Sequence, residues 1–216
     1  MNARPVLAVT FVFTGMLSGS LPDATTPPFS VHGGTPEQHQ RLADAAAVYA
    51  GAGLDLPPLE IRFYHTDSEC RGAPGYFNTG TDPWLISICT PALGWVYEHE
   101  LAHAWERANV SHELREAFLE LRGLEAWNDR SLPWNERGPE WAAVVIQQGL
   151  TGLPLPPDLS AETRSRLRGF EILTGQPAPI LIAWLEAKNV PCAERPTPLS
   201  RQLTDVGGLS CRPSAS

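Results

Sequence analysis

Two histidines four residues apart, His99 and His103, constrain this chain more than any other feature. On an α-helix this spacing places both imidazoles on one face, about 40° apart at about 100° per residue, so that they can share one metal ion. Glu100 directly follows the first histidine and completes the pattern H-E-x-x-H. The pattern therefore predicts a helix, with the Glu100 carboxyl within reach of a water molecule on the ion.

Apolar residues in the same segment predict how this helix packs. At helical spacing, a continuous apolar stripe lies on a face separate from the histidines; it consists of Leu93, Tyr97, Leu101, Ala104 and Ala108. Trp95 and Val96 flank the histidines with further apolar surface. The mixture predicts that the histidines lie in a partly covered cleft; the alternative is a solvated helix face that carries two histidines.

A third protein ligand is expected, because catalytic zinc usually has three such ligands and a water molecule. The acidic or histidine residues considered downstream are His112, Asp129, Glu136 and Glu140. We favour Glu140, thirty-seven residues after His103, because Pro139 predicts a helix start and the apolar residues of that helix lie on its other side. A glutamate in a first helical turn is also favoured by the helix dipole alone, which is the alternative explanation.

The order of the predicted elements, strands first and helices afterwards, indicates an α+β domain. The strands are expected to form a small, mostly antiparallel sheet packed against the histidine-bearing helix, followed by a helical C-terminal half. Alternating patterns predict strands at 59–64, 75–78 and 85–89. Capping residues and periodicity predict helices at 35–50, 91–108, 111–127, 139–150, 161–173 and 180–187.

The N-terminal residues predict export. Residues 1–24 have the pattern of a signal peptide, with an apolar run at 6–17 that is too short to span a bilayer comfortably. An uncleaved membrane anchor is the alternative. Residues 25–34 are interpreted as a linker, 35–188 as the domain and 189–216 as a proline-rich tail. The mature chain is accordingly expected to be secreted and to have no membrane association.

Four cysteines agree with an oxidising compartment, although four reduced thiols are the alternative. Three pairings are possible, and the sequence-local one joins Cys70 to Cys89 and Cys192 to Cys211. Each bridge would close a loop of about twenty residues, which stabilises a fold by on the order of 3 kcal/mol in the chain-entropy account. No C-x-x-C spacing is present, so a cysteine zinc site is disfavoured.

Charge and composition exclude two further classes of protein. The net charge of −8 is a poor match for a phosphate backbone, so no nucleic-acid partner is expected. Hydrophobic residues make up 43% of the chain, which is enough for a packed core and argues against a wholly disordered protein. The sequence does not indicate an oligomeric state.

The H-E-L-A-H helix followed by Glu140 resembles the small zincin metallopeptidases of the glutamate-liganded, or gluzincin, type. The resemblance covers about residues 59–150. It implies Zn²⁺ on His99, His103 and Glu140, and hydrolysis of peptide or protein substrates by a metal-activated water with Glu100 as general base. It also implies that 85–89 is the edge strand along which an extended peptide aligns.

The chain departs from the thermolysin-like pattern, and other functions stay open. The spacing to the third ligand is longer, and Val144 stands where an acid would orient the first histidine. Glu106 and Asn109 occupy the places of the further glycine and histidine of metzincins, which excludes that group. The alternatives are a zinc amidase acting on cell-wall peptides and a non-catalytic secreted binding domain on a zincin scaffold.

Overall fold

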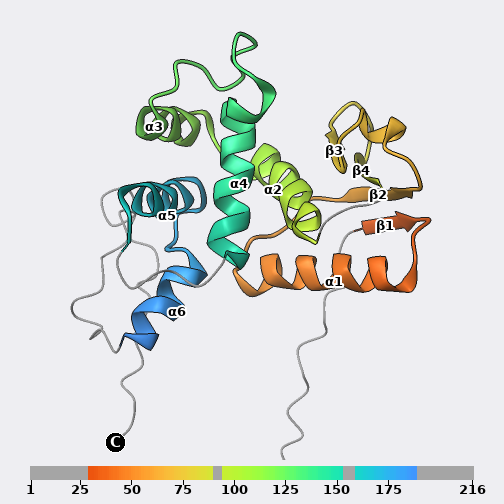
Figure 1. Ribbon diagram of the computed structural model, residues 1–216, viewed down its shortest axis with the longest axis horizontal. Helices are drawn as coiled ribbons and strands as arrows, with labels where there is room; N and C mark the ends of the chain where they lie inside the picture. Colours follow the sequence, from red (N-terminus) through yellow and green to blue (C-terminus); the bar gives the residue numbers. More distant parts are fainter. Residues whose placement is uncertain (1–28, 90–93, 153–158, 189–216) are drawn as a thin grey trace, which may run out of the picture.

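The computed structural model describes residues 29–89, 94–152 and 159–188, which form an α+β fold (Figure 1). A four-stranded sheet comes first and helices follow, as the sequence predicts. The strands are β1 (Phe29–His32), β2 (Leu59–Tyr64), β3 (Gly75–Asn78) and β4 (Trp84–Cys89). The helices are α1 (Pro36–Gly51), α2 (Trp95–Asn109), α3 (His112–Arg122), α4 (Gly138–Thr151), α5 (Ala161–Thr174) and α6 (Pro179–Ala187), with short 3-10 turns η1 (Ser68–Cys70) and η2 (Trp134–Glu136).

The sheet is mixed, so the prediction of a mostly antiparallel sheet is wrong. Its order is β1-β2-β4-β3; β1, β2 and β4 run parallel, and only β3 is antiparallel to its neighbour β4. One parallel pair, β2 with β4, arises because β4 lies between β2 and β3. The other involves β1, which lies within the stretch 25–34 that the sequence analysis interprets as a linker. Because α1 crosses over between β1 and β2, the chain returns in the same direction and the two strands pair in parallel.

Most helices lie where the sequence predicts them. α1 begins with a complete capping box, in which the Thr35 side chain accepts from the Gln38 backbone N–H and the Gln38 side chain accepts from the Thr35 N–H. α3 ends at Arg122 rather than at 127, because Gly123 adopts a left-handed conformation (φ +67°) that closes the helix. α2 begins at Trp95; residues 90–93, where an earlier start was predicted, lie outside the described residues.

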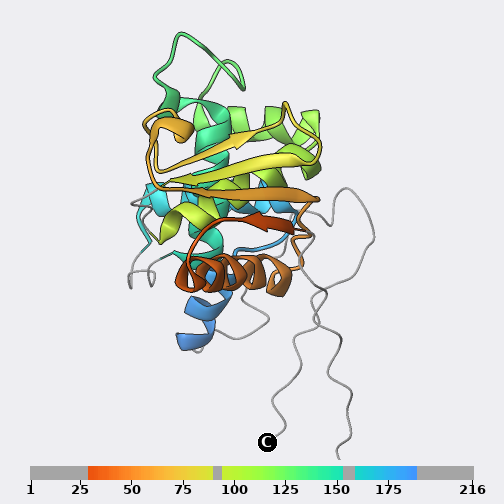
Figure 2. The ribbon, with the colours of Figure 1, turned by 90° about the vertical axis from the view of Figure 1, so that its right-hand side faces the viewer.

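The helices cover one face of the sheet (Figure 2). In β2, the side chains of Leu59, Ile61 and Phe63 are buried and alternate with the more exposed Glu60 and Arg62. Such alternation is expected when one face packs on a core and the other meets solvent. α2 packs against β3 and β4 on one side and against α4 on the other, so it lies at the centre of the core.

A disulfide joins Cys70, in η1, to Cys89 at the end of β4, which confirms one half of the predicted pairing. Both cysteines are fully buried. The bridge fixes the segment that leads into β3 against the central part of the sheet, and it indicates an oxidising environment for folding. The predicted Cys192–Cys211 bridge lies outside the described residues.

Within the described part of the chain, none of the helices has the length and apolar character needed to cross a bilayer. The predicted signal peptide (1–24) and the predicted tail (189–216) lie outside the described residues.

Candidate metal centre

The histidine-bearing helix is α2, and it is buried along most of its length. The predicted core stripe is confirmed at Tyr97, Leu101 and Ala104, which are almost inaccessible to solvent. It is wrong at Ala108, which is exposed because it lies in the last turn of the helix, and Leu93 lies outside the described residues. His99 and His103 are also buried, so the alternative of a solvated histidine face is wrong. Burying two imidazoles is costly unless their nitrogens find partners, which makes their surroundings informative.

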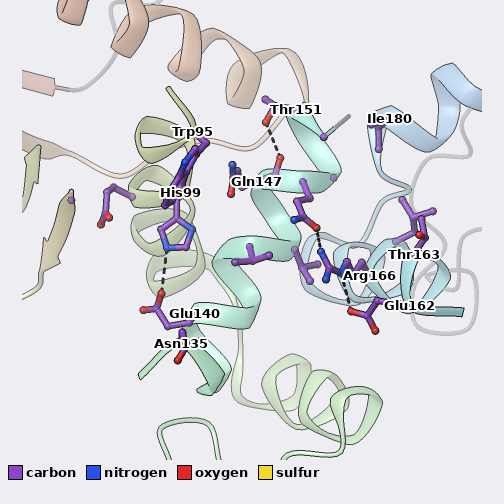
Figure 3. Close-up of a pocket in the computed structure, with 18 of the residues that line it drawn as sticks. Trp95, His99, Asn135, Glu140, Gln147, Thr151, Glu162, Thr163, Arg166 and Ile180 are labelled. Carbon is purple, nitrogen blue, oxygen red and sulfur yellow. Dashed lines mark hydrogen bonds and ion pairs between the residues drawn. The ribbon is translucent and has the colours of Figure 1, made fainter. Parts of the chain in front are cut away.

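Glu140 supplies those partners from the first turn of α4, the helix that packs against α2. One carboxylate oxygen, Oε2, lies 3.3 Å from His99 Nε2, and the other, Oε1, lies 3.2 Å from His103 Nε2. Figure 3 shows the His99 ring pointing at the Glu140 carboxylate. Glu140, which is distant in the sequence, therefore converges with the two histidines of α2.

This group fits a metal ion. The ligand atoms of His99, His103 and Glu140 all lie within 4.8 Å of one another, and all three residues are buried. Two ligand atoms on one tetrahedral zinc ion, each about 2.0–2.1 Å from it, are about 3.3 Å apart. The two histidine–carboxylate distances agree with that spacing, so the described residues offer a preformed site with two nitrogen donors and one carboxylate.

Two aromatic side chains hold the imidazoles in place. The Phe77 ring of β3 lies parallel to that of His103, with ring centres 6.3 Å apart and an interplanar angle of 2°. Trp95 meets His99 edge-on at 5.7 Å. Packed rings leave the histidines few alternative rotamers, so the nitrogens stay aimed at Glu140.

The charges of the site are strongly coupled. Burial acts to lower the pKa of both histidines; in His99 burial prevails and the pKa is lowered, whereas in His103 the Glu140 and Glu100 carboxylates raise it. Burial acts to raise the pKa of Glu140, but hydrogen bonds from His103 and His99 outweigh it and hold that pKa below its ordinary value. The Glu140 carboxylate is therefore kept ionised, the form in which it binds a metal.

Glu100 lies beside this group, in the same buried environment. Burial raises the pKa of its carboxyl to about 7; the charge of His103 opposes the shift and that of Glu140 adds to it. The side chain lies against the backbone of Gly75 at the start of β3: a Cβ at position 75 would be 2.5 Å from Glu100 Oε1. Gly75 is a site residue that sequence reasoning missed, although a glycine at the start of a strand is a signal for close approach.

The second ring nitrogen of His99, Nδ1, is buried and has no hydrogen-bond partner among the described residues. Metal-binding histidines usually donate from this nitrogen to a carboxylate or a carbonyl. Val144 of α4, whose side chain offers no acceptor, lines the nearby cavity. The absence of an acid at position 144 in the sequence thus corresponds to an unpaired His99 Nδ1 in the structure.

The other sequence candidates do not join the metal group. Exposed His112 pairs with Glu116 at 3.2 Å, and Asp129 accepts hydrogen bonds from Ser131. Glu136 is exposed. Among the candidates considered for the third ligand, only Glu140 comes within reach of both histidines.

A cavity of about 990 Å³ gives access to the centre. His99, Glu100, Glu140, Trp95 and Trp134 are among the residues that line it. Figure 3 shows Trp95, His99 and Glu140 at one end. These tryptophans are 45% and 58% exposed, and they are two of the three exposed large apolar side chains among the described residues. Exposed apolar surface gathered at one hollow is typical of a ligand-binding site.

Comparisons with models of protein families, with curated proteins and with solved structures give no match. The functional argument therefore rests on the chemistry of the site itself.

Proposed function

We propose that this chain is a zinc-dependent peptidase, in which His99, His103 and Glu140 hold the metal and Glu100 is the general base. The observation that carries the proposal is the contact of one buried carboxylate with the Nε2 atoms of both histidines of an H-E-x-x-H helix. Three protein ligands of types N, N and O, beside an open cavity, are the arrangement of catalytic zinc sites.

A bound Zn²⁺ ion would supply Lewis-acid chemistry, lowering the pKa of water and polarising a carbonyl group. The protein residues supply the rest. Glu100, held against Gly75, accepts a proton from the attacking water and later donates it to the leaving amine.

The sheet edge next to the site favours an extended substrate. The strand that was expected at the edge, 85–89, lies between β2 and β3 inside the sheet, so that part of the interpretation is corrected. The edge strand beside the metal group is β3, which begins at Gly75 and carries Phe77 against His103. We infer that an extended peptide adds to β3 and so passes across the metal and Glu100.

Export belongs to the same proposal. Residues 1–24 act as a signal peptide, and the mature chain works in the oxidising environment that the Cys70–Cys89 bridge favours. Peptide or protein substrates would then be met outside the cell.

The proposal is tested by metal analysis and peptide hydrolysis of the purified protein, beside its His103→Ala variant. We expect one zinc per wild-type chain, hydrolysis of peptides, and loss of both in the variant. Zinc binding with no turnover on a broad peptide library would contradict the enzyme and leave a metal-binding scaffold. Cleavage confined to cell-wall peptides would instead identify an amidase.

Gly75→Ala should lower kcat by about 10- to 100-fold while leaving the zinc content unchanged. The new Cβ would meet Glu100 at 2.5 Å from Oε1 and 2.8 Å from Cγ, so that the carboxylate has to move, and small misplacements of a reacting group are costly. Gly94→Ala is the matched control, since a Cβ at Gly94 meets nothing within 4 Å. Equal kcat for Gly75→Ala and wild type would show that Glu100 is not held by this contact.

A further inference from the structure

The cavity continues away from the metal along one face of α4. Glu140, Val144, Gln148 and Thr151 all line it, at the spacing of successive turns. From Glu140 to Gln148 the helix rises by about 12 Å at 1.5 Å per residue. The metal centre is thus one end of a longer groove whose floor is α4 (Figure 3).

Apolar side chains line much of this groove, and the charged ones gather at its two ends. The apolar residues include Trp95, Trp134, Val144, Leu167 and Ile180. The charged lining residues are Glu100 and Glu140 at the metal end, and Glu162 and Arg166 of α5 at the other. The second charged end is not explained by the metal chemistry.

Positive charge predominates at this second end. Arg166 donates from Nε to Glu162 Oε1 at 2.8 Å and from an Nη to Gln148 Oε1 at 2.6 Å. Arg122 of α3 approaches the same Glu162 oxygen at 3.3 Å. Two guanidinium groups therefore share one carboxylate, which leaves an excess positive charge in a protein whose net charge is −8.

The two arginines are held in position around Trp141. The Arg122 guanidinium carbon lies 4.0 Å from the centre of a Trp141 ring, and that of Arg166 lies 5.8 Å from it. The hydrogen bonds to Glu162 and Gln148 use two of the five N–H donors of Arg166, and none of the other described residues accepts a hydrogen bond from it. A fixed guanidinium with donors to spare, at the end of an apolar groove, is suited to a carboxylate.

We propose that Arg166 binds a carboxylate of the substrate, about three to four residues away from the scissile bond. This inference rests on the proposed peptidase function. An extended peptide spans about 3.3–3.6 Å per residue, so about 12 Å of groove holds three to four residues. The carboxylate belongs either to the free C-terminus of a short peptide or to an aspartate or glutamate side chain within a longer one.

The test uses the full-length zinc protein and matched peptides. One series has a free or an amidated C-terminus three or four residues beyond the scissile bond; a second has glutamate or glutamine at the same distance on either side of it. We expect wild-type kcat/KM to be about 10- to 100-fold higher for the carboxylate member of at least one series, mostly through KM. The series that discriminates identifies the source of the carboxylate.

Arg166→Gln should remove this preference by lowering kcat/KM for the carboxylate peptides to that for their neutral partners, and Arg166→Lys should restore part of the preference. Arg164→Gln is the control, because Arg164 lies on the same helix, donates to the Leu159 carbonyl and does not line the groove. A purely structural role for Arg166 would lower thermal stability and affect both members of a pair equally.

Two outcomes would overturn the inference, and they are distinguishable. If the wild type cleaves carboxylate and neutral peptides equally well, the carboxylate site is wrong and the peptidase stands. If no peptide is cleaved by a protein that holds its zinc, the proposed function fails and the inference fails with it.

Discussion

Glu100→Gln is expected to lower kcat by about 10²–10⁴-fold and to leave the zinc content at one ion per chain. Glutamine has the same shape as glutamate, so the packing against Gly75 is kept, but an amide cannot accept and return a proton. Glu100 is not one of the three residues whose ligand atoms converge, which is why metal binding should persist. The variant thus separates proton transfer from metal binding.

The measurement is kcat and KM on one peptide substrate, together with zinc analysis of the same preparation. Glu98→Gln is the matched control: Glu98 is two residues away on α2, and it is neither in the metal group nor among the residues that line the cavity. It should keep wild-type kcat within a few-fold. A Glu100→Gln protein that turned over at the wild-type rate would exclude this residue as the base.

The cluster of His99, His103 and Glu140, which could hold a metal ion, was predictable in part because some of its signal is local. His99, Glu100 and His103 lie within one helix, and helical geometry alone brings the two imidazoles together. Glu140 was predictable to a lesser degree. Its place in a first turn beside Pro139 made it a good candidate. Its contact with the histidines, however, depends on the packing of α4 on α2, and sequence periodicity does not show which helices become neighbours.

The direction of the sheet was not predictable in the same way. Residues 29–32 give only a four-residue strand, in a stretch rich in proline, glycine and threonine that resembles a linker. Without this strand, α1 does not read as a crossover, and 59–64, 75–78 and 85–89 look like consecutive antiparallel strands. The insertion of β4 between β2 and β3 depends on non-local pairing, which alternation of apolar residues does not encode.

The residues at the far end of the groove also could not be grouped from the sequence alone. Arg122, Trp141 and Arg166 come from three different helices, and nothing in their spacing along the chain relates them. They meet because α3 and α4 both pack against α5. Gly75 is an intermediate case, since a glycine at a strand start signals a close approach but does not reveal that Glu100 is the neighbour.

Glu140→Gln is expected to weaken zinc binding by tenfold or more. The amide oxygen that replaces the carboxylate is neutral, so the divalent ion loses its only anionic ligand among the three residues of the described group. The side chain still fits the space between His99 and His103, so that the fold should persist without the metal. Hydrolysis should fall in proportion to the zinc lost.

Zinc affinity is measured by competition with a chelator. A second measurement is the gain in the free energy of unfolding when zinc is added; at saturating metal, a tenfold weaker site reduces this gain by about 1.4 kcal/mol. Glu136→Gln is the matched control, because Glu136 lies four residues earlier and is exposed, and it was the nearest rival acid in the sequence. It should bind zinc as the wild type does. Unchanged affinity in Glu140→Gln, or a loss in Glu136→Gln instead, would mean that the ion is held by a different carboxylate than the one that bridges the two histidines.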